Sequence, residues 1–124
     1  MVTKLHTSES GLTRSINDRM TPSASVEHIS LRTGKQKEPG FINTLNPNGR
    51  IPVLVDRNRP TATGAEGFAV FETAAILLYL SQHYDPEHKL WFDAEKHPEE
   101  YSEMLQWISF TVRLLSSLRA RRWG

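Results

Sequence analysis

The chain has 124 residues, 38% of them hydrophobic and 23% charged, with a formal net charge of +1. These values are typical of a globular protein, and the length allows one ordinary domain or a small domain with a fragment of a second. The near-neutral charge argues against nucleic acid or an anionic membrane as the main partner. The absence of cysteine excludes disulfides, thiolate metal sites and an enzyme thiol, and the five histidines have no metal-ligand spacing, so we expect no metal.

The chain carries no pattern typical of a membrane or secreted protein. Its longest apolar run, residues 74–80, is far shorter than the ~18 residues needed to span a bilayer. No apolar signal-peptide core is present at the start. We therefore expect a cytoplasmic protein without membrane partners.

The first part of the chain predicts a β-α-β unit. Residues 2–7 form a short candidate strand, and Leu12, Ile16 and Met20 recur at helical spacing, which predicts a helix over residues 11–20. Residues 26–31 are β-branched and apolar enough for a second strand. A polar stretch follows, then one helical turn over residues 41–45 and an Asn-Pro-Asn-Gly sequence that predicts a tight turn at 46–49.

The second part predicts two strands and two helices. Residues 51–55 and 68–71 are the candidate strands of a hairpin, and residues 73–84 form a helix. The order predicts an α/β fold, a thioredoxin-like βαβ-ββα domain with a mixed sheet at 1–84. A linker at 85–97 and a single helix, a fragment of an incomplete all-helical domain at 98–124, follow it. Pro98 and the acids after it suit the start of that helix.

Ile51-Pro52 is the first candidate binding element. Proline has no N–H, so at the start of a strand it leaves neighbouring backbone groups unpaired. A cis bond there would turn the N–H and C=O of Ile51 outward, where a peptide-like ligand could pair with them as a short added strand. We expect the Ile51-Pro52 bond to be cis; a proline that merely starts a strand is the alternative.

Glu72-Thr73 is the second candidate, at the point where a strand ends and a helix begins. Free N–H groups and the positive end of the helix dipole can receive a carboxylate, Thr73 can add a hydroxyl, and Glu72 can receive an ammonium. Helix capping alone is the alternative. A thioredoxin-like fold sets the two elements side by side, which suits a ligand with a peptide middle and an amino-acid end. Glutathione is such a ligand.

Two motifs then resemble the glutathione transferase family. They are residues 41–56 (FINTLNPNGRIPVLVD) and residues 70–80 (VFETAAILLYL). At the positions of Glu72-Thr73 in the second motif, family members usually have Glu-Ser. Leu90-Trp91 and the Leu-Gln-Trp at 105–107 resemble the fungal branch that includes the nitrogen-regulatory, prion-forming transferase homologue. The resemblance covers about residues 24–110.

The resemblance implies roles for six positions in glutathione binding. Ile51 and Pro52 would hold the cysteinyl backbone, and Glu72 and Thr73 the γ-glutamyl end. Polar contacts would come from two further residues, Arg50 and Gln36. The family also implies that glutathione is the co-substrate of an attack on an electrophile, whose identity is unknown, and that the full-length protein is a homodimer.

Catalysis in the family depends on lowering the pKa of the glutathione thiol, about 8.5 when free, so that the thiolate attacks. The fungal branch places an asparagine in a Thr-Pro-Asn-Gly turn for this purpose, whereas residues 5–11 here read LHTSESG. Ser10 is the nearest substitute and Ser8 the second.

The end of the chain also departs from the family, which continues into a helical domain where residues 112–124 here read VRLLSSLRARRWG. The arginines suit a helix C-terminus or an acidic partner, and a mis-spliced or frame-shifted gene model is the interpretation that we favour. We therefore expect either a transferase, or a piece of one with little or no activity, or a non-enzymatic binding or regulatory module of the same fold.

Overall fold

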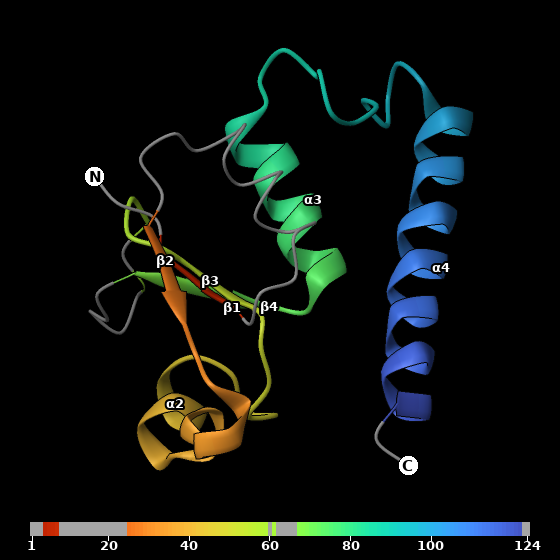
Figure 1. Cartoon of the computed structure of the whole chain (residues 1–124). Coiled ribbons are helices and arrows are strands. Elements are labelled where there is room, and N and C mark those ends of the chain that lie inside the picture. The colour runs from red at the N-terminus through yellow and green to blue at the C-terminus, as the bar shows by residue number, and fades with distance from the viewer. Residues whose placement is uncertain (1–3, 8–24, 60, 62–66, 123–124) are drawn as a thin grey trace. The chain divides into compact units, whose positions relative to one another are not determined.

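The computed structural model describes residues 4–7, 25–59, 61 and 67–122. The chain divides into two compact units, Met1–Leu80 and Ser81–Gly124. Described strands of the first unit, β1 (Lys4–Thr7), β2 (Ser25–His28), β3 (Val53–Asp56) and β4 (Phe68–Phe71), form one sheet in the order β2-β1-β3-β4 (Figure 1). β1 is parallel to β2 and antiparallel to β3, and β4 is antiparallel to β3. The mixed sheet is therefore confirmed, while the helix expected over residues 11–20 lies outside the described residues.

Two of the expected strands have different limits in the structure. β2 ends at His28 rather than at residue 31, because the backbone N–H and Oγ1 of Thr33 both donate to the carbonyl of Ser30, at 3.3 and 2.9 Å. The chain turns there into a 3₁₀ turn, η1 (Leu31–Thr33), and leaves the sheet. β3 begins at Val53 rather than at residue 51. Pairing cannot include Pro52 as a donor, because proline has no N–H.

Two further short helical segments follow η1 between β2 and β3. The 3₁₀ turn η2 (Lys35–Lys37) follows Gly34, whose φ of 72° suits glycine. Helix α2 (Pro39–Thr44) begins with proline in its first turn and buries Phe41. This helix confirms the helical turn expected near residues 41–45, and it brings the chain to the turn that precedes β3.

The sheet buries apolar side chains on both faces. Val53, Val55, Ala69 and Phe71 lie on one face of the hairpin and pack in one cluster with Ile29 and Phe41. Leu54 points to the opposite face and is fully buried. Helix α3 (Thr73–Tyr84) lies along the sheet in Figure 1, and its residues Ile76 and Leu80, four apart on one face, are fully buried too. The hairpin is thus fixed from both sides.

A buried carboxylate fixes the far end of the hairpin. Asp56 is fully buried, and its Oδ2 accepts a hydrogen bond of 2.7 Å from the hydroxyl of Tyr79 on α3. Its Oδ1 accepts the N–H of Asn58 at 2.9 Å, which shapes the turn after β3. The ring of Tyr79 also lies 5.7 Å from that of Phe68. These contacts tie α3 to the sheet at the end opposite Ile51.

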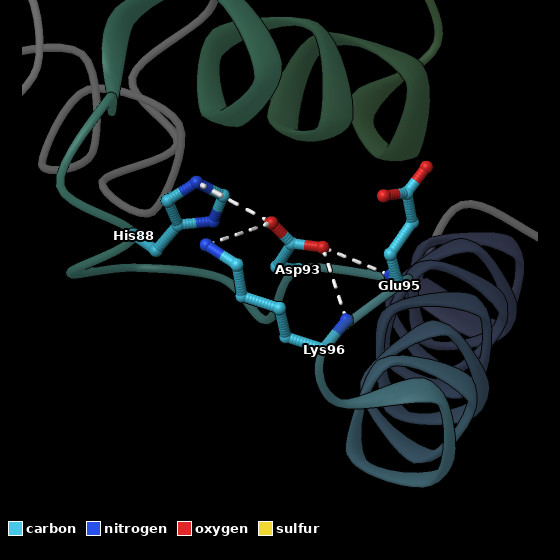
Figure 2. A network of polar contacts seen from close by, with 4 residues as sticks. All are labelled: His88, Asp93, Glu95 and Lys96. Atoms are coloured by element: carbon cyan, nitrogen blue, oxygen red, sulfur yellow. Dashed lines mark hydrogen bonds and ion pairs between the residues drawn. The ribbon is translucent and has the colours of Figure 1, made fainter.

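The second unit contains the segment before helix α4 and the helix itself (Pro98–Arg122). Asp93 stabilises the approach to the helix: its Oδ1 accepts the N–H groups of Glu95 at 2.9 Å and Lys96 at 3.3 Å (Figure 2). Those two donors hold the pKa of the Asp93 carboxyl below its ordinary value. The other carboxylate oxygen lies 3.9 Å from His88 Nε2 and 3.8 Å from Lys96 Nζ. The helix begins at Pro98, which confirms the predicted start.

Candidate functional site

The peptide bond between Ile51 and Pro52 is cis, as the sequence analysis expected. Both residues are half-buried and directly precede β3. Within the described part of the chain, neither the N–H nor the C=O of Ile51 takes part in a hydrogen bond. A free donor and acceptor on one residue can pair with the backbone of a peptide-like ligand.

Glu72 and Thr73 lie at the junction of β4 and α3. Glu72 has a φ of 72°, a left-handed conformation that costs a non-glycine residue roughly 1–2 kcal/mol. The N–H of Ile76 is the first to bond within the helix, to the Glu72 carbonyl at 2.9 Å. The N–H groups of residues 73–75 therefore have no helical acceptor, and with the helix dipole they favour an anion. The carboxylate of Glu72 is exposed and can receive a cation.

The pairing of β3 with β4 brings these two elements together. Val53 lies opposite Phe71 in the antiparallel register. Pro52 and Glu72 each lie one residue beyond this pair, so Ile51-Pro52 and Glu72-Thr73 meet at one edge of the hairpin. The register thus places free backbone groups beside a helix start and an exposed carboxylate.

The turn before Ile51 is held by a buried side chain. Asn46 is only 1% exposed; its Nδ2 donates to the carbonyl of Arg50 at 2.8 Å, and its Oδ1 accepts the N–H of Asn48 at 2.9 Å. The N–H of Gly49 donates to the Asn46 carbonyl at 2.8 Å, and the φ of Gly49 is 58°. The expected turn at 46–49 is confirmed. It fixes the backbone of Arg50, whose side chain is exposed, directly before Ile51.

Gln36 approaches this turn from η2. A Cβ added to Gly49 would lie 2.8 Å from the Gln36 carbonyl oxygen, so the two backbones are in close contact. The side-chain Oε1 of Gln36 is buried and has no hydrogen-bond partner among the described residues. A buried polar atom without a partner is costly unless another group satisfies it. Gln36 therefore lies against Gly49, the residue before Arg50, and its side-chain oxygen has unused hydrogen-bonding capacity among the described residues.

One candidate of the sequence analysis cannot be compared with this geometry, and one contributor was missed. Ser10, with its alternative Ser8, lies outside the described residues. The sequence predicts Asn46 only as part of a turn, whereas the structure shows that its side chain organises the turn. Asparagine bonding the backbone two residues ahead is a known turn pattern, and an Asn two residues before Asn-Gly was the available signal.

No metal cluster and no membrane-spanning helix accompany this site in the part of the chain that the structure describes. No group of three or more His, Cys, Asp or Glu side chains could hold a metal ion among the described residues. No described helix is long and apolar enough to cross a bilayer.

The family model described as "Glutathione S-transferase, N-terminal domain" matches residues 15–83. That range contains the Ile51-Pro52 and Glu72-Thr73 elements and the whole hairpin that joins them. It also contains Gln36 and the turn at 46–49. More than half of the chain thus follows the pattern of one family.

Curated relatives and solved structures similar to this chain include glutathione transferases and URE2 proteins. Glutathione S-transferase 1 of Schizosaccharomyces pombe is 34% identical over 85 residues, which are 68% of this chain and 33% of that protein. Protein URE2 of Candida maltosa is 33% identical over 85 residues, 66% of this chain and 23% of that protein. A glutathione transferase homolog from Lodderomyces elongisporus, crystallised with two GSH per subunit, is 34% identical with a TM-score of 0.78, covering 91% of this chain and 51% of that one. This chain spans about a third or less of these two curated relatives and about half of the solved chain.

Proposed function

The chain belongs to the glutathione S-transferase family, with a thioredoxin-like N-terminal domain related to fungal transferases and URE2, and from that premise we propose that it binds glutathione. The observation that carries the proposal is the register of β3 and β4, which joins Ile51-Pro52 to Glu72-Thr73 at one edge. The presence of GSH in the Lodderomyces homologue supports it.

Glutathione combines a peptide-like centre with an α-amino-acid end, and the edge offers one partner for each. The N–H and C=O of Ile51 pair with the cysteinyl backbone, and Pro52 shapes that backbone. The γ-glutamyl carboxylate binds at the N–H groups of residues 73–75 and the Thr73 hydroxyl, where the helix dipole adds to the attraction. The γ-glutamyl ammonium pairs with the exposed carboxylate of Glu72. The site thus matches both charges of the amino-acid end.

Polar groups on the other side of Ile51 complete the proposed site. The unpartnered Oε1 of Gln36 gains a donor from the ligand, or its amide group donates after rotation about the last side-chain bond. The exposed guanidinium of Arg50 has five donors for a carboxylate. Both residues lie at the turn that leads into Ile51. We assign them to polar contacts with glutathione.

Activation of the thiol is the second part of the proposal. In the family this step lowers the thiol pKa so that the thiolate attacks an electrophile. Ser10, by its position after the first strand, is the residue that we assign to it. A non-enzymatic binding or regulatory module is the second candidate, and the sequence LHTSESG at residues 5–11, in place of the family's Thr-Pro-Asn-Gly turn, favours it. Absorbance of bound glutathione thiolate, followed against pH in the parent chain and in Ser10→Ala, separates the two.

Three further properties complete the proposal. We propose a division into a glutathione-binding domain at 1–84, a linker at 85–97 and a fragment of a C-terminal helical domain at 98–124. We also propose a homodimer for the full-length protein and a cytoplasmic location. Light scattering at several protein concentrations tests the homodimer, and fluorescence microscopy of the tagged protein tests the cytoplasmic location.

Calorimetric titration with reduced glutathione tests the binding proposal. Glu72→Ala should weaken binding about tenfold or more, because a hydrogen bond to a charged group contributes about 1.5–3 kcal/mol. Glu38→Ala is a matched control, because Glu38 is an exposed glutamate whose side chain caps no helix. Equal affinity of Glu72→Ala and the parent chain would move the γ-glutamyl end away from α3. No heat of binding from the parent chain at millimolar glutathione would reject the function.

A further inference from the structure

Two parts of the proposed glutathione site come from separate segments. Gln36 belongs to η2, while Arg50 and Ile51 follow the turn that precedes β3. The turn has its own internal bonds through Asn46, but these do not involve η2. A contact between the segments is needed to hold Gln36 in register with Ile51.

Lys37 supplies that contact. Its Nζ donates to the carbonyl of Asn48 at 3.1 Å, across eleven positions of sequence. Its side chain also lies against the glycine of the turn, because a Cβ on Gly49 would be 2.9 Å from Lys37 Cδ and 3.2 Å from Lys37 Nζ. The stem therefore packs on the turn, and the ammonium bonds the turn from the same side.

Gly49 is what makes this packing possible. Any side chain there would collide with the Gln36 carbonyl as well as with Lys37, and the φ of 58° disfavours other residues. The absence of a Cβ lets η2 and the turn approach to backbone contact. Lys37 then fixes the residue next to it, Gln36, whose buried Oε1 has no partner in the described chain.

We propose that Lys37 is a positioning residue for glutathione binding: through Asn48 and Gly49 it holds Gln36 against the turn that leads into Arg50 and Ile51. This inference rests on the proposed function. Lys37 acts without touching the ligand, and its ammonium neutralises no ligand charge. Two properties follow: the loss of the ammonium weakens binding of any ligand that uses Gln36, and it does so whether or not the glycine carboxylate of glutathione is charged.

The first test measures the Kd of reduced glutathione by calorimetry for the parent chain, Lys37→Met and Lys35→Met. Lys37→Met keeps the stem on Gly49 and removes the donor. Lys35→Met removes the same charge from the same 3₁₀ turn, at an exposed side chain that makes no hydrogen bond or ion pair with the described residues. We expect roughly a three- to tenfold loss for Lys37→Met, equivalent to one modest hydrogen bond, and an unchanged Kd for Lys35→Met.

The second test distinguishes positioning from direct contact and from a purely structural effect. With glutathione monoethyl ester, whose glycine carboxylate is blocked, Lys37→Met should show the same fold loss as with glutathione. Lys37→Arg should recover most of the affinity, because its guanidinium can still donate to Asn48. In a Gln36→Ala background, Lys37→Met should cause little further loss, because coupled residues are not additive.

Several results would overturn the inference. A Kd of Lys37→Met equal to that of the parent, with only a lower thermal midpoint, would reduce Lys37 to a stabilising contact. A fold loss that vanishes with the ester would make Lys37 a direct ligand of the carboxylate. Losses from Lys37→Met and Gln36→Ala that multiply would show that the two act separately. Absence of binding by the parent chain would instead reject the proposed function, so the two failures are distinguishable.

Discussion

The buried amide of Asn46 gives a prediction whose size follows from its contacts. Asn46 is 1% exposed, and Asn46→Ala removes two of its hydrogen bonds, one to the Arg50 carbonyl and one from the Asn48 N–H. At about 1 kcal/mol net for each bond, with a further cost for leaving their partners unpaired, the free energy of unfolding should fall by about 2–3 kcal/mol. Glutathione affinity should fall too, because the turn fixes the backbone of Arg50, which directly precedes the proposed ligand-binding residue Ile51.

Urea denaturation of the parent and variant chains measures this loss. Asn48→Ala is a matched control, because Asn48 is exposed and its hydrogen bonds to described residues use its backbone N–H and C=O. Its free energy of unfolding should stay within about 0.5 kcal/mol of the parent value. If Asn46→Ala loses no more than Asn48→Ala, the two hydrogen bonds do not hold the turn in solution, and the reasoning is refuted.

Three other perturbations have expected outcomes. Glu72→Gly should raise or preserve the free energy of unfolding, since glycine tolerates the φ of 72°, and it should weaken glutathione binding. A loss of both stability and affinity would contradict the interpretation that the backbone of Glu72 is strained. Tyr79→Phe should lower the free energy of unfolding by about 1–3 kcal/mol, because the buried Asp56 carboxylate loses a donor; an unchanged urea midpoint would show that this bond adds nothing. The pKa of Asp93 is depressed, so its contribution to stability is present above the ordinary carboxyl pKa and is lost as the pH falls through the depressed value. Carboxyl ¹³C NMR titration measures this pKa, and a raised value would contradict the prediction.

Local patterns of the sequence were enough for the hairpin and for helix α3. Residues 68–71 and 73–84 have the limits that strand and helix periodicity predict, because each pattern is apolar on the buried side and ends at clear signals. The second strand was expected to run to residue 31, since Ile29 and Leu31 are both apolar. Hydrogen bonds from Thr33 to Ser30 take precedence over that pattern, and Leu31 is exposed.

The neighbourhood of Ile51 could be predicted only in part. The cis proline and the turn at 46–49 follow from residue types, and the meeting of Ile51-Pro52 with Glu72-Thr73 follows from the hairpin register. The contact of Lys37 with Asn48 is different, because it joins residues eleven apart through a long flexible side chain. No spacing rule describes such a contact, which exists only once η2 and the turn have packed at Gly49.

The most direct test of the account is a glutathione titration followed residue by residue in ¹⁵N-labelled protein by NMR. Binding at the proposed edge predicts that the largest amide shift changes occur at Ile51, Glu72 and Thr73, with a smaller change at Gln36. The amides of α4 should change little, since the proposed contacts lie in the first unit. Saturating glutathione that shifts only α4 amides, or none, would contradict the assignment of the site to the Ile51 and Glu72 edge.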